Sequence, residues 1–254
     1  MREQGGPAWI ALAGALALAA CGSEPAPAPS ATPAAPPSEL PDAPPSAEPE
    51  PSSAPVISTS KTASAVSATY APQDECADKP GWPTFRKALG SAIKGRDVEG
   101  MAALASADVT LDYGGGSGIA ELKKRLTDPA SGLWKELDAI LPLGCAVEGG
   151  LAAMPWVFWN VPDDIDSYSA MLVLGDDTPL LAKPGGKAVG AAGWQIVGID
   201  PLDFAPKAPA TRVTLRDGGK GYVETERLRS LLDYRLIAEP KGGTWQITAF
   251  IAGD

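Results

Sequence analysis

The sequence predicts an α+β protein in which a small helical subdomain is followed by a small β-barrel or sandwich. Between residues 85 and 141, apolar side chains recur at the three- and four-residue spacing of amphipathic helices. From about residue 169, short apolar runs alternate with glycine-rich turns, a texture typical of small all-β units. Residues 22–72 hold 13 of the chain's 26 prolines and almost no large apolar side chains. We therefore expect four segments: 1–20, 21–72, 73–168 and 169–254.

The first segment is expected to be a signal peptide, because residues 7–20 are apolar apart from glycine. The run is shorter than the roughly 20 residues that a membrane-spanning helix needs. It ends in Leu18-Ala19-Ala20-Cys21-Gly22, which resembles the lipobox of bacterial lipoproteins. This resemblance implies acylation of Cys21 and a stable lipid anchor at the outer membrane, facing the periplasm or the cell surface. The alternative is an ordinary secreted protein in which Cys21 is incidental.

The second segment, 21–72, is expected to be a disordered tether. Its Pro, Ala, Ser and Thr residues cannot bury enough apolar surface to offset the entropy lost on ordering. The globular part is therefore expected to begin near Pro72 and to stand away from the membrane.

Charge and composition exclude several classes of partner and chemistry. The formal net charge is −10 and there is no cluster of basic residues, which argues against binding to nucleic acid. The chain contains no histidine, so no Ser-His or Cys-His pair can form. We expect no catalytic residues, no metal and no cofactor.

Two cysteines remain once Cys21 is assigned to the lipid. Cys76 and Cys145 would lie in a compartment that permits disulfides, and we expect them to form one. The alternative is a pair of buried free thiols. A zinc site is disfavoured, because two cysteines without a histidine are too few ligands.

Capping residues mark the helices of the third segment. Asp97 is placed to cap one helix, Ser117 another and Ser131 a third. A strand is expected at Val109–Tyr113, where apolar and polar residues alternate. The glycine run at 114–118 matches no complete phosphate-binding motif, so we interpret it as a tight turn.

The fourth segment resembles the bacterial SH3-like domain over residues 170–230. The resemblance lies in Leu181-Ala182-Lys183-Pro184, in Val213-Thr214-Leu215-Arg216-Asp217-Gly218-Gly219-Lys220-Gly221-Tyr222-Val223, and in Leu228. It implies an SH3-like β-barrel that binds cell-wall peptide or polysaccharide. The sequence departs from the family pattern at Ala210-Thr211, where an aromatic residue is usual, and in a proline-rich insertion at 201–209.

Aromatic side chains are the candidate ligand contacts, since flat rings stack on sugars and peptides. Tyr222 and Trp194 are the residues we select. For Tyr222 a ligand contact and a core position are about equally supported, whereas Trp245 fits the core better. A hairpin is expected around Glu239–Gly243, joining the last two strands of the barrel segment.

Asp163, Asp164 and Asp166 form the densest acidic cluster, and paired carboxylates can hydrolyse glycosidic bonds. Because the cluster follows Pro162 in a polar stretch, a solvated loop explains it better. The two resemblances together imply a lipid-anchored envelope lipoprotein with a non-enzymatic module that binds cell-wall peptide or polysaccharide, with peptidoglycan as the expected partner. The alternatives are an adaptor for an envelope protein complex and, less favoured, a carboxylate-dependent cell-wall hydrolase.

Overall fold

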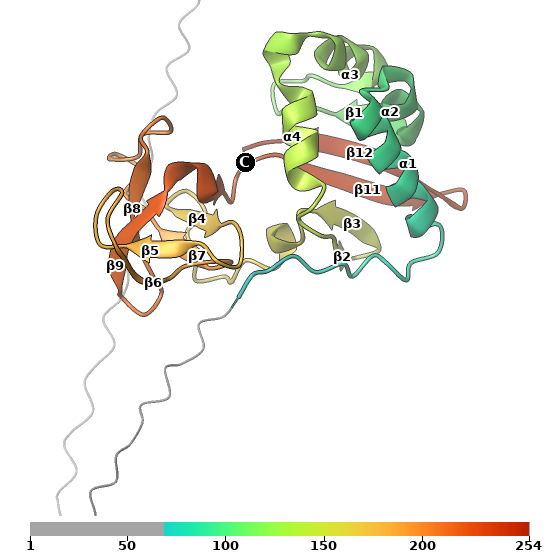
Figure 1. Ribbon diagram of the computed structural model, residues 1–254. Coiled ribbons are helices and arrows are strands. Elements are labelled where there is room, and N and C mark those ends of the chain that lie inside the picture. The colour runs from blue at the N-terminus through green and yellow to red at the C-terminus, as the bar shows by residue number, and fades with distance from the viewer. Residues whose placement is uncertain (1–68, 254) are drawn as a thin grey trace, which may run out of the picture. The chain divides into compact units, whose positions relative to one another are not determined.

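The computed structural model describes residues 69–253 (Figure 1), which belong to one compact unit. The predicted signal peptide (1–20), Cys21 and the tether up to residue 68 lie outside the described residues. Two sheets and four α-helices make up the described part, so the predicted α+β class is confirmed. Among residues 69–253, no helix has both the length and the apolar character needed to cross a bilayer. The segment boundaries at 72/73 and 168/169 stay predictions.

The first sheet has five strands in the order β1-β12-β11-β3-β2. Its members are β1 (Ala105–Thr110), β2 (Ala146–Glu148), β3 (Leu151–Met154), β11 (Arg235–Lys241) and β12 (Thr244–Ile251). Strands β1 and β12 are parallel, and the other neighbours are antiparallel. The helices are α1 (Trp82–Gly95), α2 (Val98–Leu104), α3 (Gly118–Thr127) and α4 (Leu133–Ile140), with short 3-10 turns at Pro129–Ser131, Trp156–Trp159 and Thr225–Arg227.

The apolar faces of the helices meet the first sheet in a single core. Leu89 of α1, Leu122 of α3 and Leu137 of α4 are each at most 2% exposed, and they share a cluster with Leu236 and Phe250 of the sheet. Figure 1 shows α1 and α4 lying across β11 and β12. The helical spacing read from the sequence therefore places these leucines on one buried face of each helix.

The C-terminal hairpin belongs to this first sheet. The sequence predicts β11 and β12 as part of the barrel segment 169–254, but β11 pairs with β3, and β12 pairs with β1. The hairpin itself forms as predicted, with Pro240 opposite Trp245. A physical reason is that β2 and β3 have only three and four residues, too little surface to cover three amphipathic helices. The two long C-terminal strands supply the missing apolar face.

The predicted caps and strand of the helical part are only partly confirmed. The Asp97 side chain accepts a hydrogen bond from the Gly100 N–H at 2.9 Å, as expected of a cap. Ser117 precedes α3 but makes no side-chain cap bond, so that prediction is wrong. The strand predicted at 109–113 begins earlier, at Ala105, because it aligns with β12, and Tyr113 lies exposed beyond it.

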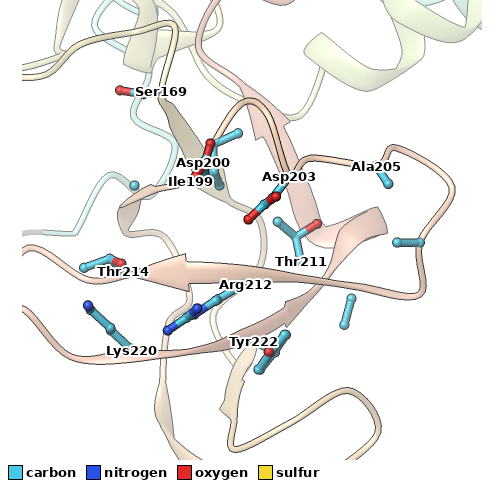
Figure 2. Close-up of a pocket in the computed structure, with 13 residues that line it drawn as sticks. Ser169, Ile199, Asp200, Asp203, Ala205, Thr211, Arg212, Thr214, Lys220 and Tyr222 are labelled. Atoms are coloured by element: carbon cyan, nitrogen blue, oxygen red, sulfur yellow. The ribbon is translucent and has the colours of Figure 1, made fainter.

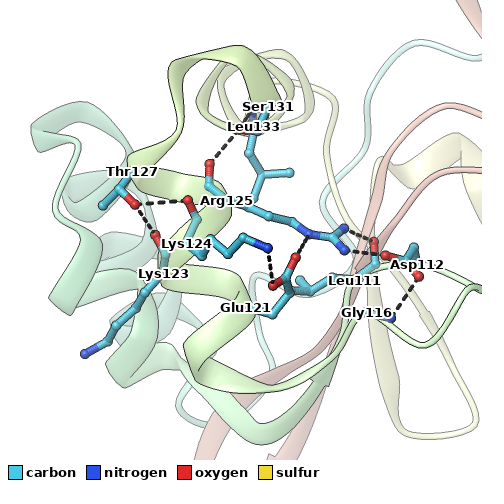
Figure 3. A network of polar contacts seen from close by, with 10 residues as sticks. All are labelled: Leu111, Asp112, Gly116, Glu121, Lys123, Lys124, Arg125, Thr127, Ser131 and Leu133. Atoms are coloured by element: carbon cyan, nitrogen blue, oxygen red, sulfur yellow. Dashed lines mark hydrogen bonds and ion pairs between the residues drawn. The ribbon is translucent and has the colours of Figure 1, made fainter. Parts of the chain in front are cut away.

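The glycine run at 114–118 forms a turn, held by a charged network (Figure 3). The Arg125 guanidinium pairs with Asp112, pairs with Glu121 at 2.9 Å and donates to the Leu111 carbonyl at 3.0 Å. Asp112 in turn accepts from the Gly116 N–H at 2.9 Å. The hydrogen bond from Arg125 lowers the pKa of the Asp112 carboxyl, with the Gly116 bond adding to it. The turn is thus a structural feature that connects β1 to α3.

The predicted disulfide between Cys76 and Cys145 is present, and both residues are buried. It joins the segment before α1 to the start of β2, across 69 residues of sequence. The backbone supports the same junction, because Cys145 donates to the Gln73 carbonyl at 2.7 Å and accepts from Glu75 at 2.9 Å. The alternative of two free thiols is therefore excluded.

The second sheet has seven strands in the order β10-β4-β7-β8-β9-β5-β6, all antiparallel. They are β4 (Ala170–Val173), β5 (Pro179–Leu181), β6 (Ala188–Ala191), β7 (Ile196–Gly198), β8 (Ala210–Thr214), β9 (Lys220–Glu224) and β10 (Leu228–Ser230). The series is open within the described residues, since its ends β10 and β6 do not pair with each other. A closed barrel is therefore not formed by these strands, although the short strands expected from about residue 169 onward are present.

Candidate binding site

A cleft of about 630 Å³ lies over one face of the second sheet, beside the loop at residues 199–209 (Figure 2). Its size falls within the range typical of ligand pockets, roughly 300–1,000 Å³. Strands β7, β8 and β9 and that loop supply its walls. The lining residues are Ser169, Gly198, Ile199, Asp200, Asp203, Ala205, Ala208, Ala210, Thr211, Arg212, Thr214, Lys220 and Tyr222.

Strands β8 and β9 place four polar side chains along the floor of the cleft. Arg212 lies opposite Tyr222, and Thr214 lies opposite Lys220, in an antiparallel register. Since alternate residues of a strand point to the same side, these four share one face. The intervening Val213 is 1% exposed and packs into the core on the other side. The alternation of apolar and polar residues in this hairpin therefore determines which side chains can meet a ligand.

The loop at 199–209 is anchored at its first residue, next to β4, and is stabilised by a hydrogen bond within the loop. The Ile199 N–H donates to the Ser169 carbonyl at 2.8 Å, and the Leu202 N–H donates to the Asp200 carboxylate at 3.0 Å. Phe204 packs against the core of the second sheet. In contrast, the Leu202 side chain is 95% exposed at the tip of the loop. The proline-rich insertion that departs from the family pattern thus forms one wall of the cleft.

The cleft carries charges of both signs. Arg212 and Lys220 lie on the strands, and Asp200 and Asp203 lie on the loop (Figure 2). All four are exposed. Within residues 69–253, none of the four takes part in an ion pair. Together with the Tyr222 ring, they offer hydrogen-bond donors, hydrogen-bond acceptors and a flat apolar surface, a combination suited to a ligand that has both polar and apolar groups.

The structure separates the two ligand contacts that the sequence predicts. Tyr222 is partly buried and lines the cleft. Trp194 lies elsewhere, packed against a cluster that includes Trp156 and Leu172. Its backbone has a φ of 50°, and its carbonyl accepts from the Tyr70 N–H at 2.6 Å. Trp194 therefore helps to join the start of the described chain to the second sheet and does not share a site with Tyr222.

Trp245 belongs to the core, as expected. Its ring is 7% exposed and meets Trp82 edge to face, with centroids 5.1 Å apart. Its indole N–H donates to the Pro80 carbonyl at 2.9 Å. Both the apolar surface and the polar handle of this tryptophan are thus satisfied inside the protein.

The acidic cluster at 163–166 lies in an exposed loop, as the preferred interpretation predicts. The Asp164 carboxylate pairs with Arg216 at 2.8 Å. Asp166 accepts from the Ser169 hydroxyl at 2.6 Å, and this bond lowers the pKa of the Asp166 carboxyl. A general acid in glycoside hydrolysis needs the opposite shift, which a desolvated environment would provide.

A possible metal-binding group also lies away from the cleft. Asp74, Cys76 and Cys145 have ligand atoms within 4.8 Å of one another. The two sulfur atoms are joined in the disulfide, so they are not thiolates that could bind a metal.

Sequence reasoning missed Asp200, Asp203, Arg212 and Lys220 as site residues. For the two cations a signal exists in the sequence. Residues 212, 214, 220 and 222 are polar positions arranged symmetrically about the Asp217-Gly218 turn, so a hairpin places them on one face. For the two aspartates no such signal exists, because the path of a loop depends on contacts distant in sequence.

No protein-family model matches this chain, and no curated protein does either. Among solved structures, one similar chain is an NTF2-like protein with a cystatin-like fold from Novosphingobium aromaticivorans. The two sequences are 11% identical, the match covers 68% of this chain and 79% of that chain, and the TM-score is 0.27. Another is a protein of unknown function with a cystatin-like fold from Nostoc punctiforme, with 10% identity, coverage of 71% and 93%, and a TM-score of 0.27. At TM-scores this low, these likenesses assign neither fold nor function.

Proposed function

We propose that this protein is a lipid-anchored cell-envelope protein whose residues 170–230 form a non-enzymatic module that binds cell-wall peptide or polysaccharide. The observation that carries the proposal is the cleft of about 630 Å³ in which Tyr222 lies among four charged side chains without ion-pair partners in residues 69–253. A site with one accessible ring and several polar groups can hold an oligomer of sugars or amino acids.

The resemblance to the bacterial SH3-like domain supports the same function. Its best-matched residues, Asp217-Gly218 and Gly221-Tyr222-Val223, lie in the β8–β9 hairpin that forms the cleft floor. The family pattern has an aromatic side chain near Ala210, and here Ala210 lines the cleft. A smaller side chain leaves more room at that end. We therefore propose an SH3-like module with an open sheet and a site of its own composition.

Membrane attachment is proposed from the sequence around Cys21 alone. Expression of the full chain in a Gram-negative host, with an alkyne-tagged fatty acid in the medium, tests it directly. We expect label on the wild-type protein and its recovery in the outer-membrane fraction. The Cys21→Ser variant is expected to carry no label. Equal labelling of both, or no labelling of the wild type, contradicts the anchor.

Co-sedimentation with isolated cell-wall sacculi tests the binding function. The chain from Gly22 to Asp254 lacks Cys21 and therefore the lipid, so pelleting reports on the protein alone. We expect saturable pelleting that soluble wall fragments compete away. Tyr222→Ala is expected to weaken it by up to about tenfold, because one stacked ring is worth roughly 0.5–1.5 kcal/mol. Tyr168→Ala is the matched control, since Tyr168 is exposed and does not line the cleft.

An adaptor for an envelope protein complex is the second candidate, and one observation favours it. Leu202 is 95% exposed on the loop beside the cleft, where it could insert into a pocket of a protein partner. If the folded chain does not pellet with sacculi, crosslinking through residue 202 in intact cells becomes the test of this role. A discrete crosslinked partner that Leu202→Ser abolishes would support the adaptor over wall binding.

A further inference from the structure

The arrangement of charges in the cleft indicates the chemistry of the ligand. The two cations, Arg212 and Lys220, lie on β8 and β9, whereas the two carboxylates, Asp200 and Asp203, lie on the loop (Figure 2). Ion pairing does occur close by: Arg216, two residues beyond Thr214, pairs with Asp164 at 2.8 Å although both are well exposed. The four cleft residues form no pair within residues 69–253, either with one another or with other groups.

The strand wall is suited to a carboxylate. In the β8–β9 register, Arg212 lies beside Tyr222, and Lys220 is the diagonal neighbour of Arg212 on the same face. A guanidinium binds a carboxylate through two parallel N–H donors, and a lysine ammonium adds a third donor with charge. The hydroxyl group of Thr214, opposite Lys220, offers a further donor.

The loop wall is suited to an ammonium group. The Asp203 side chain has no hydrogen bond within the described part of the chain, and Asp200 uses one oxygen for the Leu202 N–H. Both carboxylates therefore keep acceptor sites for the three N–H bonds of an amine. A purely anionic ligand would be repelled by these two carboxylates. A purely cationic ligand would be repelled by Arg212 and Lys220. A neutral glycan would use neither wall.

On the premise of the proposed wall-binding function, we infer that the ligand of this cleft is a zwitterionic peptide. Its free carboxylate lies on Arg212 and Lys220, and its free ammonium lies on Asp200 and Asp203. This selects peptide over polysaccharide as the wall component that the protein recognises.

Capped and uncapped trialanine peptides separate the two charges while they keep the same backbone. The probes are trialanine with free ends, its N-acetyl form, its C-terminal amide and the doubly capped form, with chitotetraose as the neutral sugar. Each is titrated into the chain 22–254 by isothermal calorimetry at low salt. We expect the free peptide to bind about tenfold more tightly than either singly capped form, because each cap removes one set of charge-assisted hydrogen bonds.

Two double variants assign each end of the peptide to a wall. In Arg212→Gln/Lys220→Gln, amidation of the peptide is expected to have no further effect, while acetylation still weakens binding. In Asp200→Asn/Asp203→Asn, the reverse is expected. Arg216→Gln is the matched control, because it removes a cation from the end of the same hairpin but does not line the cleft. Thermal unfolding of each variant verifies that it is folded.

The outcomes distinguish this inference from the function on which it rests. Equal binding of the four peptides, binding of chitotetraose alone, or no binding of any probe overturns the zwitterionic ligand. Displaceable pelleting with sacculi that Tyr222→Ala weakens would leave the wall-binding function standing in each of those cases. Absence of pelleting by the folded wild type would overturn the function itself.

Discussion

Removal of the disulfide gives the most quantitative test of how the helical part is held together. The bond closes a loop of 69 residues between Cys76 and Cys145. In the chain-entropy treatment, a loop of this length corresponds to about 4 kcal/mol of stability at 25 °C, through a less disordered unfolded state. The double variant Cys76→Ala/Cys145→Ala is therefore expected to lose about that much free energy of unfolding.

The variant is nevertheless expected to fold. The backbone hydrogen bonds that join Cys145 to Gln73 and Glu75, at 2.7 and 2.9 Å, do not depend on the sulfur atoms. Urea unfolding of the chain 22–254, followed by tryptophan fluorescence, measures the loss. Reductant is expected to destabilise the wild type and to leave the double variant unchanged. A loss below about 1 kcal/mol would refute the entropic reasoning, as would a reductant effect on the variant.

Three further predictions concern the first sheet and the helices that pack on it. Trp245→Ala removes a buried ring packed on Trp82, so we expect a loss of about 3–5 kcal/mol in urea unfolding, with Trp245→Phe much milder. Arg125 lowers the pKa of Asp112, so the wild type is expected to be more stable than Asp112→Asn above pH 4. This difference in stability is expected to disappear as the pH falls through the lowered pKa. A difference that stays constant from pH 2 to pH 7 contradicts the prediction. Desolvation raises the pKa of Glu136, which means that its charged form is unfavourable in the folded protein. Glu136→Gln is therefore expected to raise the unfolding temperature at pH 7 and to have no such effect below pH 4, where the carboxyl is protonated. A lower unfolding temperature of the variant at pH 7 would contradict this prediction.

Local signals in the sequence predict the elements well. The apolar spacing within α1, α3 and α4, the cap at Asp97 and the turn around Gly242 each depend on residues within a few positions of one another. Such signals are set by backbone sterics and by burial of one face, so they can be read without knowing the fold.

The partners of the strands could not be read in this way. The parallel pairing of β1 with β12 joins Ala105 to Ile247, and no local pattern records which distant strand completes a sheet. The assignment of the C-terminal hairpin to the barrel failed for this reason. The alternation of apolar and polar residues in β11 and β12 was predicted correctly, but their apolar face packs against the helices and not against the second sheet.

Only part of the candidate site could be predicted from the sequence. Tyr222 could be selected because it is a large ring in a turn-flanked strand, and it does line the cleft. Trp194 is also a large ring, yet it packs against a different cluster, at a position where the backbone is left-handed (φ 50°). Asp200 and Asp203 depend on how the 199–209 loop folds back on the sheet, which contacts such as Ile199 with Ser169 determine.

Hydrogen exchange tests the central claim most directly, because it locates bound ligand on the chain. The chain 22–254 would be compared with and without soluble fragments released from sacculi by a muramidase, with digestion into short peptides and mass spectrometry. We predict slower exchange in peptides that cover residues 199–214 and 219–224, and no change in those from α1 to α4. Slower exchange confined to the helical part, while the fragments bind, would contradict the proposal that this cleft is the binding site.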